Sequence, residues 1–278
     1  MKHKEGEFIG EKDIKIYYQA WLPDHNPKAV IQIVHGFGEH SGRYENVVNK
    51  LIPLGYALYA DDHRGHGKSE GITNYVDSFD QYIEDEKRLY NIVKNNHKEL
   101  KYFMLGHSLG SGIAIYFTDK YEDLLDGLIL SGTGSTAGAE VSGFIRFMSK
   151  ILSKLAPRMT IDPKLDPKSL SHDPEVVKAY EEDPLVHHKE ITTRLGYEMI
   201  KYFEGVENVV KKFKLPLLVQ CGSKDQAMHG IEELKKHFKM DDKTIKIYNG
   251  LYHEVYNEKK KKREEVLEDL AEWLENHI

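Results

Sequence analysis

The sequence has almost no cysteine, no excess of basic residues and no long apolar run. Its single cysteine, Cys221, has no partner for an internal disulfide or a cysteine-rich zinc site, and burial as a small apolar side chain is the simplest interpretation. The 39 Lys and Arg residues against 45 Asp and Glu residues give a formal net charge of −6. Most nucleic-acid-binding proteins carry the opposite excess, so we expect no nucleic-acid partner.

The first residues also lack the apolar stretch of a secretory signal, because charged residues occur from Lys2 onward. No run approaches the roughly 18 consecutive apolar residues that span a bilayer. Even residues 51–60 are interrupted by Pro53 and Gly55. These absences lead us to expect a cytoplasmic protein, with peripheral contact at membranes as the open alternative.

Short apolar runs bounded by turn residues alternate with longer helical patterns, which is typical of an α/β fold. The first run, residues 14–21, predicts a half-exposed antiparallel strand. Further runs predict strands at residues 29–34, 56–60, 102–105, 125–130, 215–220 and 244–248. Apolar residues on one face then predict a C-terminal helix, with a solvated start at residues 259–263. We therefore expect one domain over residues 1–278, with a mostly parallel central sheet flanked by helices.

The connection between residues 130 and 215 is too long for an ordinary loop, contains helical patterns and shows no strand pattern. We interpret approximately residues 135–206 as a helical cap inserted between two core strands. One amphipathic pattern in it carries apolar residues at spacings of three and four: Phe144, Ile145, Phe147, Met148, Ile151, Leu152 and Leu155. Such a face suits covering an active site or touching a membrane or micelle, and packing within the cap is an equal alternative.

The sharpest chemical pattern is GHSLG at residues 106–110, between a predicted strand and a predicted helix. An abrupt strand-to-helix turn strains the junction residue and requires small neighbours, which Gly106 and Gly110 provide. Ser108 would then project its hydroxyl clear of the sheet as a nucleophile. The backbone N–H of Leu109 would lie at a helix N-terminus, where negative charge is favoured. The alternative is an ordinary glycine-containing turn.

Two loops after later strands supply an acid and then a histidine, in the chain order that this kind of nucleophile requires. Asp225 follows the strand predicted at residues 215–220, and His253 follows the one predicted at residues 244–248. Asp225 would fix the orientation of His253, which would take the Ser108 proton and return it to the leaving alcohol. The pattern predicts a catalytic triad of Ser108, Asp225 and His253.

A glycine-rich loop, HGFGEHSGRY at residues 35–44, follows an early predicted strand. Gly36 and Gly38 allow close approach of the backbone, so the N–H of Phe37 is the candidate partner of Leu109 in an oxyanion hole. A tight turn is the alternative. The glycine spacing here does not fit a dinucleotide site, and we expect no cofactor.

Two pairs of histidines are the remaining candidates for metal ligands. His63 with His66, and His187 with His188, lack a convincing set of further ligands. Serine hydrolysis also requires no metal. We therefore expect no metal site.

Together these motifs resemble the monoacylglycerol lipases and related lysophospholipases of the α/β-hydrolase fold. The resemblance runs through nearly the whole chain and rests on HGFGEHSGRY at residues 35–44, DHRGHGKSEG at 62–71, GHSLG at 106–110, YEEDPL at 180–185 and the Asp225 and His253 loops. It implies an α/β-hydrolase fold, the same triad, and Phe37 and Leu109 as oxyanion donors.

The resemblance also implies roles around the substrate. By residue-by-residue matching, Glu39, Arg43, His107 and Tyr180 are neighbours of a glycerol head group or supports of the site. Each has a structural alternative of equal weight: Glu39 and Arg43 as holders of the oxyanion loop, His107 as a packing residue, and Tyr180 as an anchor of the cap.

We thus expect a serine hydrolase that cleaves monoacylglycerols to glycerol and free fatty acid through an acyl-enzyme on Ser108. A single-acyl lipid ester would be its small-molecule partner, with transient membrane or micelle contact through the cap. The enzymatic alternatives are a lysophospholipase, or a carboxylesterase acting on short-chain or hydroxycinnamoyl (feruloyl) esters. A non-catalytic binding protein of the same fold is the alternative from another class.

Overall fold

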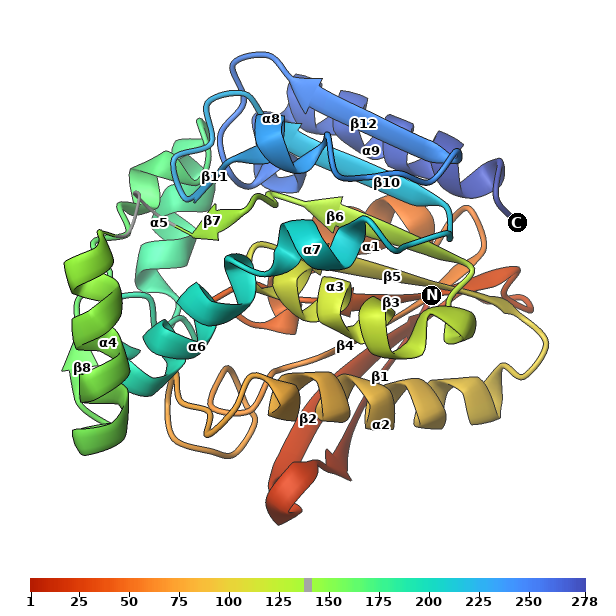
Figure 1. The fold of residues 1–278 in the computed structure, drawn as a ribbon. Coiled ribbons are helices and arrows are strands. Elements are labelled where there is room, and N and C mark those ends of the chain that lie inside the picture. The colour runs from red at the N-terminus through yellow and green to blue at the C-terminus, as the bar shows by residue number, and fades with distance from the viewer. Residues whose placement is uncertain (138–141) are drawn as a thin grey trace.

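A computed structural model describes residues 1–137 and 142–278. Within these ranges an eight-stranded sheet forms the centre of the molecule, in the spatial order β1-β2-β4-β3-β5-β6-β10-β12 (Figure 1). Its strands are β1 (Lys2–Ile9), β2 (Lys15–Leu22), β3 (Ala29–Val34), β4 (Tyr56–Asp61), β5 (Lys101–His107), β6 (Gly127–Ser131), β10 (Leu217–Gly222) and β12 (Lys243–Tyr248). β2 pairs antiparallel with β1 and β4, and all other pairs are parallel. The mostly parallel sheet confirms the predicted α/β class.

The central strands are buried on both faces. Every residue of β3, β4 and β10 is buried, which is why these strands read as continuous apolar runs rather than alternating ones. β1 is the opposite case, because its sequence KHKEGEFI is mostly exposed at the edge of the sheet. No apolar pattern marks it, so the sequence analysis did not predict this strand.

Helices cover both faces of the sheet (Figure 1). The helices are α1 (Glu45–Leu51), α2 (Asp80–Asn96), α3 (Leu109–Tyr121), α4 (Gly143–Leu155), α5 (Pro174–Glu182), α6 (Thr193–Phe203), α7 (Val206–Val210), α8 (Ile231–Leu234) and α9 (Lys260–Glu275), with 3₁₀ turns η1 (Glu11–Asp13), η2 (Ser41–Tyr44), η3 (Glu122–Leu124), η4 (Pro167–Ser169) and η5 (Val255–Asn257). One apolar cluster joins the sheet to α2, α3 and α7, and a second joins it to α1 and α9.

The C-terminal helix lies as predicted. Its apolar face packs into the second cluster, where the Trp273 ring meets Phe103 of β5 edge-on at 5.9 Å between centroids. Burying each large side chain of this kind stabilises the fold by about 1.5–3 kcal/mol. The basic start of the helix, residues 259–262, is exposed.

Between β6 and β10 the chain leaves the sheet and forms α4 to α7 beside it; we call residues 132–216 the insert, of which 138–141 lie outside the described residues. Figure 1 shows α4, α5 and α6 together at one end of the sheet. The sequence shows no strand pattern here, but the structure contains two short strand pairs. β8 (Thr160–Ile161) pairs with β9 (Ile191–Thr192), and β7 (Thr136–Ala137) pairs with β11 (Met228–His229). Two-residue strands are too short to produce a periodic pattern.

The predicted amphipathic helix of the insert is α4, and its apolar residues have two environments. α4 packs against α6, so part of its apolar surface is used within the insert. Phe144, Phe147 and Leu155 remain 73%, 61% and 80% exposed. Within the described ranges, no helix combines the length and the apolar character that crossing a bilayer requires.

Candidate active site

Ser108 sits at the junction of β5 and α3 with φ 54° and ψ −119°, outside the regions that a residue with a side chain readily adopts. Its neighbours make this strained conformation possible. A Cβ on Gly106 would collide with the carbonyl oxygen of Gly110, and a Cβ on Gly110 would collide with that of Val34 in β3. The Ser108 N–H donates to the Ser131 carbonyl at 3.0 Å, which ties the turn to β6. Strain of this kind concentrates at functional sites.

The loops after β10 and β12 bring Asp225 and His253 together, although they are 28 residues apart. His253 Nδ1 lies 2.7 Å from Asp225 Oδ2, and the other carboxylate oxygen accepts from the N–H groups of Ala227 and Met228 at 2.8 and 2.9 Å. Burial alone would raise the pKa of Asp225, but His253 and these hydrogen bonds hold it below its usual value. Since the carboxylate fixes the proton on Nδ1, the Nε2 atom of His253 is left as the base.

A cavity of about 950 Å³ opens over Ser108 and His253. Phe37 lines it, and the insert contributes much of its wall. The apolar side chains on that wall include Ile145, Leu170, Ile191, Met199, Ile200 and Phe203. The size and the largely apolar lining with a few converging polar groups are those of a small-molecule site.

The two predicted oxyanion donors both lie at this cavity or beside it. Leu109 is the first residue of α3, so its N–H has no acceptor within the helix. Phe37 lies in the loop between β3 and η2 and lines the cavity. The loop is held from within, because the Gly36 N–H donates to Glu39 Oε1 at 2.6 Å. Gly38 adopts a left-handed φ of 68°, which favours glycine.

The same loop is also held from outside by the insert. The carbonyl of Gly38 accepts from the N–H of His187 at 2.8 Å, and His40 Nε2 lies 2.9 Å from Asp183 Oδ2. Asn74 donates to the carbonyl of His187 at 2.6 Å from the other side. The end of the insert is therefore part of the support of the oxyanion loop.

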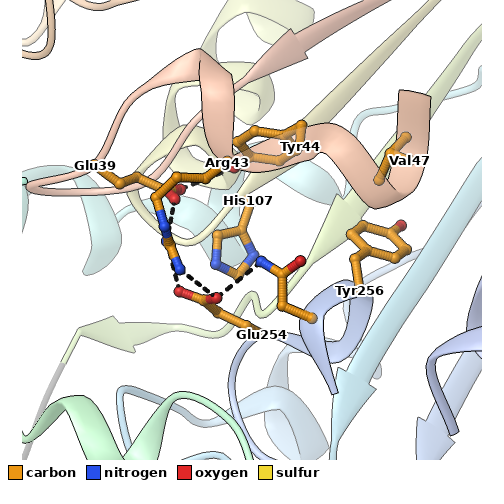
Figure 2. A pocket seen from close by; sticks show the side chains of 8 residues that line it. Glu39, Arg43, Tyr44, Val47, His107, Glu254 and Tyr256 are labelled. Atoms are coloured by element: carbon orange, nitrogen blue, oxygen red, sulfur yellow. Dashed lines mark hydrogen bonds and ion pairs between the residues drawn. The ribbon is translucent and has the colours of Figure 1, made fainter. Parts of the chain in front are cut away.

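Beneath the cavity, the Arg43 guanidinium is shared by two buried carboxylates (Figure 2). Arg43 Nη1 lies 2.5 Å from Glu39 Oε2 and 2.8 Å from Glu254 Oε1, and Nη2 lies 2.8 Å from Glu254 Oε2. The Tyr180 ring covers the guanidinium at 4.5 Å. Burial opposes ionisation of Glu254, but Arg43 outweighs it and lowers the pKa of Glu254 to about 2.

His107 packs against the triad histidine and lines the same small pocket as Glu39, Arg43 and Glu254. Its ring centroid is 4.7 Å from that of His253, and its Nδ1 is 3.3 Å from Ser131 Oγ. Burial, together with His253, lowers the pKa of His107 to about 4, so His107 is neutral near pH 7.

All four predicted substrate contacts, Glu39, Arg43, His107 and Tyr180, line the cavity. The sequence analysis missed Glu254, which lines it too. The available signal was a charged residue directly after the candidate base.

One group in the described part of the chain has the donor types of a metal site: Asp61, His63 and Glu86, all buried, with donor atoms within 4.8 Å of one another. His63 Nε2 donates to the His35 carbonyl at 3.0 Å, which connects the group to the start of the oxyanion loop. Burial and the neighbouring Asp61 carboxylate raise the pKa of Glu86 well above its usual value. The neutral form of Glu86 is therefore favoured, which reduces the negative charge that this cluster would offer to a cation.

Comparison with known proteins agrees with this geometry. A family model described as serine aminopeptidase, S33, matches residues 25–260. The chain is 36% identical over 276 residues to a monoacylglycerol lipase of Mycolicibacterium smegmatis. This match covers 99% of this chain and 98% of that protein. A monoacylglycerol lipase from Paleococcus ferrophilus superposes over all of both chains with a TM-score of 0.82 at 30% identity. A carboxyl esterase from Bacillus coagulans, solved in complex with glycerol, covers 100% of this chain and 99% of its own, with a TM-score of 0.86 at 25% identity.

These matches extend over nearly the whole chain and include both the sheet and the insert. The fold is thus the α/β-hydrolase fold that the motifs implied, and its relatives are lipases and esterases. The chain belongs to the monoacylglycerol lipase family of α/β-hydrolase enzymes.

Proposed function

We propose that this protein hydrolyses monoacylglycerols to glycerol and free fatty acid, with Ser108, Asp225 and His253 as its catalytic triad. The observation that carries the proposal is that Ser108, in its strained conformation, lines the same cavity as His253. The Nδ1 atom of His253 lies 2.7 Å from Asp225 Oδ2. The names of the Mycolicibacterium and Paleococcus relatives support the substrate class.

In the first half of the reaction, His253 Nε2 takes the proton of Ser108 as its Oγ attacks the ester carbonyl carbon. The negative charge that develops on the carbonyl oxygen accepts hydrogen bonds from the N–H groups of Phe37 and Leu109. Each such donor contributes on the order of 3 kcal/mol of transition-state stabilisation. As the carbonyl re-forms, His253 gives its proton to the departing glycerol oxygen, and the acyl group remains on Ser108.

In the second half, water takes the place of glycerol. His253 Nε2 removes a proton from the water as its oxygen attacks the acyl carbon, and the same two N–H groups hold the oxyanion. Collapse of the intermediate returns the proton to Ser108 Oγ and releases the fatty acid. Asp225 stabilises the imidazolium of His253 in both halves.

The cap, approximately residues 135–206, supplies the acyl site in this proposal. Its apolar wall removes the acyl chain of the substrate from water, which stabilises the complex by about 0.8 kcal/mol for each buried CH₂ group. Affinity should therefore rise with chain length until the cavity is filled.

The floor of the cavity is suited to a neutral head group. On this floor Glu39 and Glu254 both engage Arg43, so these three groups together carry a net charge of −1. A glycerol hydroxyl can exchange hydrogen bonds with such carboxylates and with His107, whereas an anionic phosphate would be repelled. We therefore assign Glu39, Arg43, His107 and Tyr180 to the head-group site, and the structure of the Bacillus coagulans esterase in complex with glycerol supports glycerol as the head group.

The exposed side of α4 is the proposed contact with a membrane or micelle. Phe144 and Phe147 are exposed beside basic residues of the same helix, an arrangement that suits an anionic lipid surface. Replacing both phenylalanines with Ser should reduce co-sedimentation with anionic vesicles. Unchanged co-sedimentation would contradict this assignment.

The test of the function is product release by the purified enzyme on monoacylglycerols of increasing chain length, beside lysophosphatidylcholine and a feruloyl ester. Fatty acid and glycerol should appear fastest from medium or long monoacylglycerols, and Ser108→Ala should abolish release. A faster reaction with either competitor would overturn the substrate assignment. Product formation by Ser108→Ala would overturn the triad, and silence of the wild-type enzyme on all three esters would favour a binding protein.

A further inference from the structure

A buried carboxylate next to the proposed base has no part in the proton transfers above. Glu254 follows His253 in the chain, and its side chain is 5% exposed. Its two oxygens accept from the two terminal nitrogens of Arg43, both at 2.8 Å, and Oε2 also accepts from Asn257 Nδ2 at 2.9 Å (Figure 2). A planar two-bond pairing of this kind fixes orientation as well as distance.

Arg43 passes this constraint to the oxyanion loop. Its Nη1 also meets Glu39 Oε2, and the other oxygen of Glu39 accepts from the Gly36 N–H at 2.6 Å and from Tyr44 Oη at 2.9 Å. Gly36 directly precedes Phe37, the proposed oxyanion donor. A continuous set of buried hydrogen bonds thus joins the loop of the base to the loop of the donor, across 211 residues of sequence.

The network also carries a charge. Two carboxylates and one guanidinium leave a net charge of −1 in a buried place. The groups that face His253 are Asp225 after β10, His107 from β5, Glu39 and Arg43 from the oxyanion side, and Glu254 from its own loop. Burial lowers the pKa of His253, but Asp225, Glu254 and Glu39 outweigh it and leave the pKa raised.

We propose that Glu254 is a positioning residue for this reaction: through Arg43 it holds the loop of His253 against the oxyanion loop, and its charge favours the imidazolium that forms on His253. The inference rests on the proposed function, because it takes His253 as the base. Nothing in the triad pattern itself requires an acidic residue at this position.

The test is Glu254→Gln, which keeps the shape of the side chain and removes its charge. Arg43 stays paired with Glu39 in this variant, so the buried network becomes neutral and no lone charge is left. Loss of the carboxylate disfavours protonated His253, and the pKa of His253 should fall by about one unit, the order produced by one nearby buried charge. The maximal rate should fall about tenfold, because the imidazolium of the transition state loses the same support.

The readout is the rate at which a fluorophosphonate modifies Ser108, measured from about pH 4.5 to 8. This probe needs the Ser108–His253 pair but no lipid, and the midpoint of its acid limb reports the pKa of His253. Glu258→Gln is the matched control. Glu258 is a buried carboxylate of the same loop, but it bonds His172 and the Tyr252 N–H instead of Arg43. The Glu258→Gln variant should be less stable in urea, while the pH midpoint of its labelling rate stays at the wild-type value.

A lower midpoint in Glu254→Gln alone would support the inference. An unchanged midpoint, or an equal shift in Glu258→Gln, would overturn it, since a merely structural role lowers stability without moving a titration. A wrong substrate assignment would give a different result from a wrong role for Glu254: wild-type Ser108 would react with the phosphonate, but monoacylglycerols would release no glycerol. A wild-type Ser108 that resists the phosphonate would overturn both proposals.

Discussion

Removing the cation beneath the cavity should destabilise the protein strongly, with an unusual dependence on pH. Arg43 is 9% exposed and Glu254 is 5% exposed, and Glu39 completes the group. In Arg43→Met the two carboxylates would be buried together without a counter-ion, and breaking such a buried pair costs about 3–5 kcal/mol. The matched control is Lys12→Met, because the Lys12–Asp77 pair is 58% and 51% exposed and should be worth less than about 1 kcal/mol.

The sign of the pH dependence follows from the pKa of Glu254. In the wild type this pKa is lowered to about 2, so the stabilisation by Arg43 is present above about pH 4.5 and is lost as the pH falls toward 2. Without Arg43, burial should raise the pKa of Glu254 above its unfolded value, so the penalty is largest at high pH and is relieved by protonation. Urea unfolding at about pH 8 and pH 5 should show a smaller difference between variant and wild type at pH 5. A loss below about 1 kcal/mol, or one that is equal at both pH values, would refute the reasoning.

Three further outcomes can be checked with the same protein. Gly110→Ala should cost about 3 kcal/mol in urea unfolding and abolish phosphonate labelling, because its Cβ would collide with the Val34 carbonyl; a stable, reactive variant would contradict the elbow geometry. Asp225→Asn should lower kcat by about 10³–10⁴-fold with an unchanged circular dichroism spectrum, since the imidazole loses its orienting carboxylate. The rate should fall with decreasing pH through a midpoint above 6.5, because the base must be neutral and the pKa of His253 is raised; a midpoint below 6.5 would argue against Asp225, Glu254 and Glu39 as groups that raise this pKa.

Much of this fold was predictable because its signals are local. A buried parallel strand carries a continuous apolar run, and the strained turn at Ser108 demands the small residues on either side that the sequence displays. Asp225 and His253 were predictable for a similar reason, since each lies in the loop after a predicted strand: Asp225 after the buried β10 and His253 after the half-buried edge strand β12. The polar edge strand β1 was not, because its stability comes from pairing with β2 rather than from a pattern of its own.

The support of the site could not be predicted, because it is formed by contacts between distant residues. Glu254 and Arg43 are 211 residues apart, and no local pattern shows that a carboxylate after His253 meets a guanidinium near the start of the chain. The approach of Asp61 to Glu86 is hidden in the same way, since one lies at the end of β4 and the other within α2. Resemblance to a family named Arg43 and Glu39 but did not indicate that Arg43 also binds Glu254.

The hydrogen bond from His187 to Gly38 limits how this enzyme can be re-engineered. The final part of the insert, from Asp183 onward, is a brace for the oxyanion loop as well as the end of the cap. A foreign cap grafted in place of the whole insert would remove that brace together with the old acyl wall, and turnover would drop for every ester. Grafts that end before Tyr180 would exchange chain-length preference while keeping both this brace and the Tyr180 ring over Arg43.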